Sequence, residues 1–172
     1  MVNRHPSHYL DIGVLGEELV AKWLQSTGWV ILHRRWRCRC GEIDIIARQD
    51  PPKTPHSSPI LVFVEVKTRS RGNWDAGGLL SITQRKQAKL IQAARYFLGI
   101  YPNLADYTCR FDVALVCCQR LSPQRYNLGE IAVTLEAKAG SSSLPVQLEQ
   151  AKAVKYQLIL QEYSPSAFDS DG

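Results

Sequence analysis

The sequence predicts an α/β fold in which a central mixed sheet is flanked by helices. Three observations lead to this class. Two segments repeat apolar residues at helical spacing, several short runs are rich in β-branched residues, and the order along the chain is helix, three strands, helix and strand. With 172 residues, of which 45% are hydrophobic, the chain is long enough for one domain with a buried core, which we expect to span residues 1–172.

The N-terminal third supplies a helix and two strands. Residues 8–28 are expected to form an amphipathic helix that ends at Gly28. Its apolar stripe contains Val14, Leu15, Leu19, Val20, Trp23 and Leu24. Residues 29–36 and 41–47 are expected to form strands joined by a turn, and residues 48–59, which contain four prolines, to form a loop.

The middle of the chain completes the expected core, which covers about residues 10–118. Residues 60–68 predict a third strand, residues 83–98 a second helix, and residues 110–118 a fourth strand. The buried stripe of the second helix contains Leu90, Ile91, Ala94, Phe97 and Leu98.

Beyond this core the pattern is weaker. A segment of about residues 119–150 has no role that the sequence assigns, although residues 126–135 fit a strand and residues 140–145 a linker. The C-terminal element, about residues 151–166, contains the run VKYQLILQEY, which fits either a strand or a helix.

Composition indicates a cytoplasmic protein that is not attached to a membrane. The N-terminal residues do not resemble a signal peptide, and no run of 18 apolar residues occurs. Five cysteines, an odd number, are most simply reduced thiols. Cys38 and Cys40 form a CxC pair that could bind zinc together with Cys117 and Cys118, so a zinc-stabilised structural protein is one alternative.

Positive charge is concentrated in the first two thirds of the chain. Residues 1–110 contain 16 lysines and arginines against 9 acidic residues, whereas residues 111–172 contain 5 against 7. The basic residues occur in clusters around positions 34–39, 67–71 and 85–89. Such clusters are typical of a surface that binds a polyanion, although a solvated surface without a partner has the same composition.

The third strand carries charges where an apolar strand should have none. Side chains alternate between the faces of a strand, so Glu65 and Lys67 share a face with Phe63, while Val64 and Val66 lie on the other. A strand that is apolar on both faces is normally buried on both, and a buried charge must be paired or bound to a metal. A structural Glu65–Lys67 pair is the simplest interpretation of this strand alone.

A second acid in the preceding strand favours a different interpretation. In the run GEIDIIA, Ile43, Ile45 and Ala47 are expected on one face, and Glu42, Asp44 and Ile46 on the other. If the two strands are antiparallel neighbours, Asp44 and Glu65 meet at one end of the sheet. Two adjacent carboxylates repel each other unless one is protonated or a cation lies between them.

This pair of acids predicts a site for a hard divalent cation, Mg²⁺ or Mn²⁺. The ligands would be Asp44, Glu65 and the backbone carbonyl of Val66. The cation would polarise a phosphodiester and help to form hydroxide, while Lys67 orients the attacking water or stabilises developing charge. Asp112, between Phe111 and Val113, is interpreted instead as a structural hydrogen-bond acceptor.

Five segments, in order, resemble the YraN-type family of bacterial proteins. They are residues 16–24, 37–47, 62–69, 86–90 and 110–115. The spacing from Asp44 to the Glu65-Val66-Lys67 motif also resembles the wider PD-(D/E)xK nuclease superfamily. The resemblance covers about residues 10–118 and implies a restriction-endonuclease-like core, related in fold to archaeal Holliday-junction resolvases.

The resemblance also implies roles that spacing alone does not assign. It implies that Glu17 is a third acid near the metal, whereas its position in the helix does not distinguish it from Glu18. It implies that Lys86 is a basic residue facing the site. Arg35 stands where the family usually has asparagine, and the segment 119–150 is an addition to the family's usual length.

The sequence therefore predicts a metal-dependent endonuclease-like protein that hydrolyses phosphodiester bonds in DNA, including branched or repair intermediates. Glu17, Asp44, Glu65 and Lys67 are its predicted catalytic residues. The predicted DNA-binding residues are Arg34, Arg37, Arg69, Arg71, Lys86 and Lys89. The main alternative is a nucleic-acid-binding module without catalysis, since both would carry the same basic clusters. The oligomeric state is left open, with a homodimer as one alternative.

Overall fold

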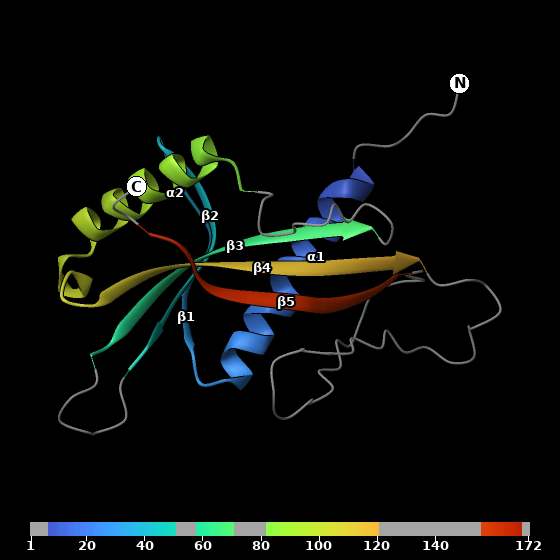
Figure 1. Ribbon diagram of the computed structural model, residues 1–172, viewed down its shortest axis with the longest axis horizontal. Helices are drawn as coiled ribbons and strands as arrows, with labels where there is room; N and C mark the ends of the chain where they lie inside the picture. The colour runs from blue at the N-terminus through green and yellow to red at the C-terminus, as the bar shows by residue number, and fades with distance from the viewer. Residues whose placement is uncertain (1–6, 51–57, 71–81, 121–155, 170–172) are drawn as a thin grey trace.

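The computed structural model describes residues 7–50, 58–70, 82–120 and 156–169 (Figure 1). In chain order the elements are α1 (Ser7–Ser26), β1 (Val30–Cys38), β2 (Gly41–Gln49), β3 (Ile60–Ser70), α2 (Gln84–Ile100), the short 3₁₀ helix η2 (Pro102–Leu104), β4 (Thr108–Arg120) and β5 (Tyr156–Phe168). The predicted helices and the first four strands are confirmed to within a few residues at each end. The run VKYQLILQEY, which fitted either a strand or a helix, contributes to strand β5.

All five strands form one mixed sheet in the order β1-β2-β3-β4-β5. Strands β3 and β4 are parallel, and the other neighbours are antiparallel. Helix α2 connects the parallel pair, as a crossover between parallel strands requires. The predicted α/β class with a mixed sheet flanked by helices is confirmed. The expected strand at 126–135 and linker at 140–145 lie outside the described residues.

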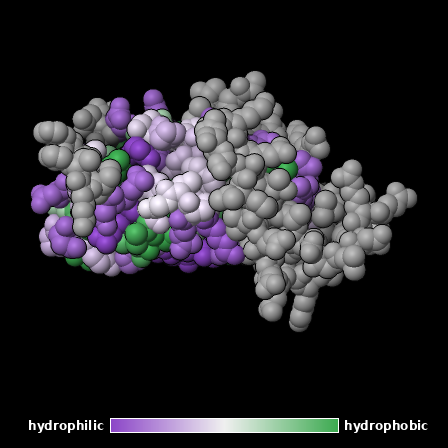
Figure 2. Space-filling view, turned by 90° about the horizontal axis from the view of Figure 1, so that it is seen from below, coloured by the Kyte–Doolittle hydropathy of each residue, from purple (hydrophilic) through white to green (hydrophobic). Residues whose placement is uncertain are grey.

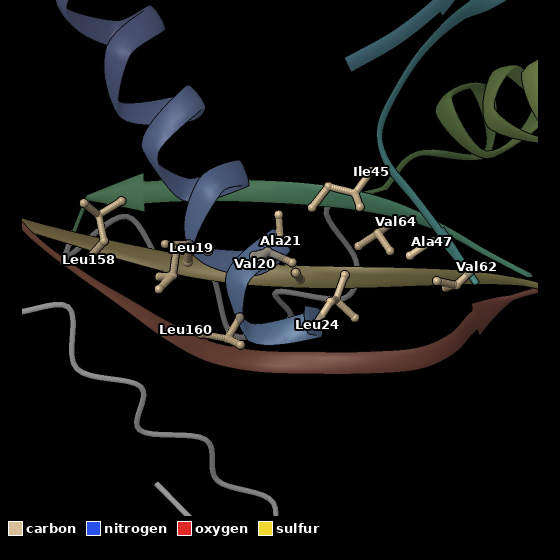
Figure 3. Close-up of a cluster of buried hydrophobic side chains, with 12 residues drawn as sticks. Leu19, Val20, Ala21, Leu24, Ile45, Ala47, Val62, Val64, Leu158 and Leu160 are labelled. Carbon is tan, nitrogen blue, oxygen red and sulfur yellow. The ribbon is translucent and has the colours of Figure 1, made fainter. Parts of the chain in front are cut away.

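Helices α1 and α2 each pack on an apolar core of the sheet, and a smaller cluster of Ile82, Val113 and Leu115 lies apart from both. The α1-side core consists of Leu19, Val20, Ala21, Leu24, Ile45, Ala47, Val62, Val64, Ala114, Val116, Leu158 and Leu160 (Figure 3). The α2-side core consists of Ile43, Ile46, Leu61, Phe63, Leu90, Ala93, Ala94, Phe97, Leu104 and Phe111. Alternate residues of β3 enter the two cores, which confirms that this strand is buried on both faces.

One expectation about β2 is wrong. Ile43 packs in the α2-side core with Ile46, whereas Ile45 packs in the α1-side core, so the two-residue alternation is interrupted at Asp44. The interruption coincides with an irregularity in the neighbouring strand, where Arg35 has a left-handed backbone (φ 50°) between the pairs Arg34↔Ile45 and Trp36↔Ile43. The paired register of β2 with β3 also ends at Ile45↔Val64. Strand β2 therefore separates from β3 at Asp44.

Asp112 is a structural hydrogen-bond acceptor, as predicted. It is 1% exposed and accepts two hydrogen bonds of 2.8 Å from the Arg110 guanidinium. The Tyr163 hydroxyl donates to it at 2.6 Å and the Ser166 backbone N–H at 3.0 Å. Burial raises the pKa of Tyr163, and the Asp112 carboxylate raises it further. This network joins β4 to β5 and uses both oxygens of the carboxylate.

The outer surface of the described chain is mainly polar. On the face seen in Figure 2, hydrophilic side chains predominate and the hydrophobic patches are small and separate. Among the described residues, the exposed large hydrophobic side chains are Val30, Tyr96 and Ile100. No described helix combines the length and the apolar character needed to cross a membrane.

Candidate active site

The candidate site lies where β2 separates from β3. Asp44 Oδ2 accepts a hydrogen bond of 2.7 Å from the backbone N–H of Val66, in place of a partner from the strand ladder. The two predicted acids are therefore on adjacent antiparallel strands, with Asp44 held against the residue that follows Glu65. Because both backbone polar groups of a strand residue point to the same side, the carbonyl of Val66 is also directed toward the edge at which β2 departs.

Glu65 is the most deeply buried acid of the site. Its side chain is 3% exposed, and two ammonium groups approach its carboxylate from different elements. Lys67 Nζ, from the same strand, donates to Oε1 at 2.7 Å. Lys86 Nζ, from the start of α2, lies 2.9 Å from Oε2 as an ion pair whose angle is not that of a hydrogen bond. Glu65 thus has the partner that the simplest interpretation of β3 expected, together with a second cation.

Helix α2 begins in a way that directs Lys86 at the site. The Thr83 side chain is the N-cap of α2 and accepts a hydrogen bond of 3.3 Å from the backbone N–H of Lys86. Lys86 therefore occupies the first turn, and its side chain reaches Glu65 on β3. The contact joins two residues that are 21 positions apart in the sequence, so its distance could not be read from spacing.

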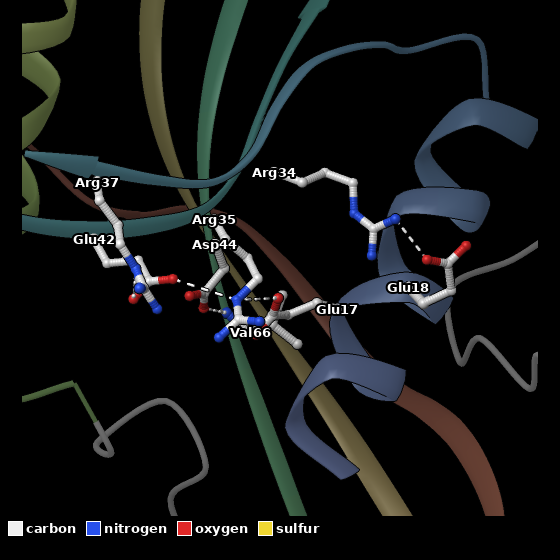
Figure 4. Close-up of polar contacts among 8 residues, drawn as sticks. All are labelled: Glu17, Glu18, Arg34, Arg35, Arg37, Glu42, Asp44 and Val66. Atoms are coloured by element: carbon white, nitrogen blue, oxygen red, sulfur yellow. Dashed lines mark hydrogen bonds and ion pairs between the residues drawn. The ribbon is translucent and has the colours of Figure 1, made fainter. Parts of the chain in front are cut away.

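Helix α1 contributes the third acid through a close approach to β3. Gly16 lies so near Thr68 that a Cβ at residue 16 would be 2.0 Å from Thr68 Oγ1. The next residue, Glu17, is turned toward Asp44 and Val66, whereas Glu18 points to Arg34 (Figure 4). Glu17 Oε2 is buried without a hydrogen bond and lies 3.6 Å from Arg35 Nε. The structure thus separates the two glutamates that spacing alone did not.

The three acids interact electrostatically. Burial raises the pKa of Asp44 to about 7, and the Glu65 carboxylate adds to this effect, while the Val66 N–H opposes it. Burial also raises the pKa of Glu17, against the lowering effect of Arg35. A nearby cation would stabilise the ionised form of these carboxylates and would therefore lower their raised pKa values.

The donor set fits a divalent cation held by few protein ligands. Among the described residues, no three His, Cys, Asp or Glu side chains are grouped as metal ligands. Mg²⁺, however, is usually bound through one or two carboxylates and keeps several waters. Asp44, Glu65 and the Val66 carbonyl match that requirement. Buried Oε2 atoms of Glu17 and Glu65 without hydrogen bonds, and the raised pKa of Asp44, are the features that such a cation would relieve.

The predicted DNA-binding residues occupy different positions around this site. Lys86 contacts Glu65, and Lys89 is exposed one turn further along α2. Arg34 pairs with Glu18 at 2.5 Å and Arg37 with Glu42 at 3.0 Å. Arg69 is half-buried near the end of β3, and Arg71 lies outside the described residues.

Two functional candidates were not selected from the sequence. The Arg35 guanidinium lies between Glu17 and Glu42, with Nε at 3.6 and 3.4 Å from their carboxylates. Its left-handed backbone is unusual for arginine and common for asparagine, the residue expected at this position from the resemblance. The sequence signals for Arg35 were this departure and its place in the basic cluster at positions 34–39. Glu42 had no sequence signal beyond its position two residues before Asp44 in the same predicted strand.

The cysteines do not support a zinc site in the part of the chain that the structure describes. All five are free thiols, and no three ligand-type side chains are grouped there. Cys38 and Cys40 pack against the α2-side core, and the Cys40 backbone N–H donates to Cys38 Sγ at 3.3 Å. Cys117 and Cys118 are buried in β4.

Comparison with known proteins gives consistent matches. The model of a family described as "Uncharacterised protein family UPF0102" matches residues 16–116. A UPF0102 protein of Trichodesmium erythraeum is 48% identical over 94% of this chain and 91% of its own length. UPF0102 proteins of Trichormus variabilis and Acaryochloris marina are 49% and 45% identical, each over 94% of this chain, and the alignments cover 96% and 92% of those proteins. Alignments of this extent include most of the segment 119–150.

Proposed function

This chain belongs to the uncharacterised protein family UPF0102, as its resemblance to the YraN-type family predicted, and we propose that it is a metal-dependent endonuclease acting on DNA. The observation that carries the proposal is the arrangement around Glu65. A buried carboxylate with two ammonium groups lies beside a second carboxylate that is fixed by the Val66 backbone. A purely structural ion pair has no need of a second acid with a pKa raised to about 7.

Asp44, Glu65 and the Val66 carbonyl would hold Mg²⁺, with Mn²⁺ as an alternative. When bound, the cation supplies Lewis acidity for the phosphodiester and lowers the pKa of a coordinated water. The hydrogen bond from Val66 N–H fixes one oxygen of Asp44 and leaves the other free to bind. Positioning of this kind is the protein's part in metal catalysis.

The two lysines would act on the phosphate. Lys67 Nζ is within 2.7 Å of Glu65, so it is held next to the bond that would be cleaved. There it orients the attacking water and stabilises charge that develops on the phosphate oxygens. Lys86 supplies a second positive charge from the other side of Glu65. Glu17 is an auxiliary group that orients water or accepts its proton.

DNA is the proposed substrate because basic residues are concentrated in the elements around the acids. Helix α2 contains four basic residues and no acidic ones, and β1 contains three arginines. The relation in fold to junction resolvases that the family resemblance implies makes branched DNA and repair intermediates the first substrates to test. The free thiols support the cytoplasmic location that we propose.

A second candidate is a DNA-binding module without catalysis. The observation that favours it is that Lys67 and Lys86 already balance the charge of Glu65. Within the described residues, no three ligand side chains are grouped as for a metal. In this second candidate the basic surface binds phosphates, and the acids stay paired with the lysines.

One experiment separates the two candidates. Purified protein is incubated with labelled duplex, nicked, single-stranded and four-way-junction DNA in Mg²⁺, in Mn²⁺ and in EDTA. Metal-dependent cleavage by the wild type should be abolished by Glu65→Gln and Lys67→Ala and greatly reduced by Glu17→Gln. Glu18→Gln is the matched control, because Glu18 follows Glu17 but pairs with Arg34. DNA binding without cleavage of any substrate would favour the second candidate.

A further inference from the structure

The outer surface of α2 combines cations with exposed apolar side chains. One stripe of exposed residues has spacings of three or four: Arg85, Lys89, Gln92, Tyr96 and Ile100. Arg95 is exposed beside this stripe. Tyr96 is 40% exposed and Ile100 is 50% exposed. Single exposed apolar side chains are normal on a protein surface, so Tyr96 and Ile100 are informative only together with the cations around them.

The Tyr96 ring is part of an aromatic and cationic group between α2 and the β1–β2 hairpin. The centroid of its ring lies 6.2 Å from that of Trp36, with 44° between the planes. The Arg39 guanidinium carbon lies 5.5 Å from the Tyr96 centroid. Trp36 in turn packs edge-on against Phe97 of the α2-side core, at 5.3 Å. Tyr96 is therefore a partly exposed ring on a rigid base, with the Arg39 guanidinium over one of its faces.

The cations near this ring are free of acidic partners within the described chain. Arg39, Arg85, Lys89 and Arg95 form no ion pair with another described residue, whereas Arg34, Arg35 and Arg37 each pair with a glutamate. Uncompensated cations interspersed with an exposed aromatic ring are the pattern of proteins that bind single-stranded nucleic acid.

The exposed stripe begins at Arg85, the residue before Lys86 of the candidate active site. Lys86, in the first turn of α2, contacts Glu65, and Tyr96 lies ten residues further on, or about 15 Å along the helix. A chain of phosphates bound at Lys86 could therefore continue past Lys89 to the ring.

We propose that the outer stripe of α2 and the Arg39 hairpin bind an unpaired single-stranded segment of DNA, with a base stacked on Tyr96 and phosphates at Lys89, Arg95 and Arg39. The proposal rests on the proposed function, because it defines the substrate class as DNA with unpaired bases. A duplex offers no free base face for the ring, so stacking selects single strands. A second copy of the chain is disfavoured as the partner, since the same uncompensated positive charge would face itself.

The test measures binding without cleavage. A fluorescein-labelled oligothymidine of about 15 nucleotides is titrated in EDTA, and binding is followed by fluorescence anisotropy. Tyr96→Leu keeps an apolar side chain but removes the ring, and should weaken binding by roughly 5- to 150-fold. Tyr96→Phe keeps the ring and should bind like the wild type. An oligonucleotide of the same length with abasic sites should bind the wild type and Tyr96→Leu equally.

A charge variant tests the phosphate contacts. Lys89→Gln should lower the slope of log affinity against log salt by about 0.7, as expected for one contact with a single strand. Lys22→Gln is the matched control, because Lys22 is on α1 and pairs with Glu18. Its salt slope should equal that of the wild type.

The results distinguish this proposal from the nuclease proposal. Loss of affinity in Tyr96→Leu with no cleavage by the wild type would support the stacking surface and reject the nuclease. Metal-dependent cleavage together with equal oligothymidine affinity in Tyr96→Leu and wild type would overturn the stacking surface alone. Tighter binding of a duplex than of the single strand would also overturn it. So would a dimer in sedimentation analysis that Tyr96→Leu converts to a monomer, because the ring would then be a subunit contact.

Discussion

Gly16 allows α1 to approach β3 at the candidate site, and replacing it with alanine should disturb both stability and activity. The new Cβ would lie 2.0 Å from Thr68 Oγ1, and ordinary contact begins at 3.4 Å, so the two atoms must separate by about 1.4 Å. Thr68 Cβ would be 3.2 Å away, so rotation of the threonine side chain does not remove the contact completely. Overpacking of this kind costs about 1–3 kcal/mol of unfolding free energy.

The displacement should act on the site because Glu17 follows Gly16 on the same helix. A shift of about 1 Å in a positioned group can reduce a reaction rate by roughly 100-fold. Urea unfolding measures the stability of Gly16→Ala, and the metal-dependent cleavage assay measures its activity at a temperature where the protein stays folded.

Two changes at Thr68 provide the control. Thr68→Ala removes the nearest atom, so the double variant Gly16→Ala/Thr68→Ala should recover most of the lost stability. Thr68→Val keeps the clashing volume and should not rescue Gly16→Ala. Alone, Thr68→Val should be nearly neutral, since it removes a buried hydroxyl that has no hydrogen-bond partner. Wild-type stability of Gly16→Ala, or equal rescue by both changes, would refute the close-contact argument.

Three further predictions concern charged groups. Asp112→Ala leaves the half-buried Arg110 guanidinium and Tyr163 hydroxyl without their acceptor, and should lower the unfolding free energy by about 3–5 kcal/mol in urea titrations. A loss below about 1 kcal/mol would contradict the network. Glu65→Gln and Lys67→Ala should each abolish cleavage and retain DNA binding in the folded protein. Glu65→Gln should also lower the unfolding free energy, because Glu65 has two cationic partners. Cleavage by either folded variant would remove that residue from the mechanism. The folded pKa of Asp44 is about 7, above its ordinary value of 3.8, so the folded state holds more protons between these values. Without metal, the contribution of Asp44 to the unfolding free energy should therefore fall as pH rises from about 4 to about 7. Asp44→Asn should remove this pH dependence from urea unfolding measurements. The same pH dependence in Asp44→Asn and wild type would show that another group titrates.

The sequence predicted the elements because apolar periodicity is a local property. The helical spacing of Leu90, Ala94 and Phe97 needs only the chain itself, and these residues do form the buried face of α2. The apolar run of β3 likewise indicated burial on both faces, which the two cores confirm. Alternation also predicted that Glu65 and Lys67 share a face, and they are in contact.

Local patterns failed where a residue's direction depends on another strand. Alternation placed Ile43 on the same face as Ile45, but Ile43 packs in the other core. The alternation of β2 breaks at Asp44, opposite the left-handed backbone of Arg35 on the adjacent strand. The choice between Glu17 and Glu18 likewise required the packing of α1 on Thr68, since the two residues are equivalent in spacing.

By itself, the sequence determined which segments form helices and strands, that the third strand is buried, and that Asp44, Glu65 and Lys67 are the residues to consider together. Residue spacing did not show that Lys86 reaches Glu65 or that Glu17 and not Glu18 faces Asp44, although the family resemblance implied both roles. Only the tertiary structure showed these contacts and the hydrogen bond from the Val66 backbone to Asp44. The physical reason is the distance along the chain over which each effect acts. Periodicity follows from the backbone geometry of a few residues, whereas the distance between a helix and a strand depends on how side chains as small as Gly16 and Thr68 pack across the whole core.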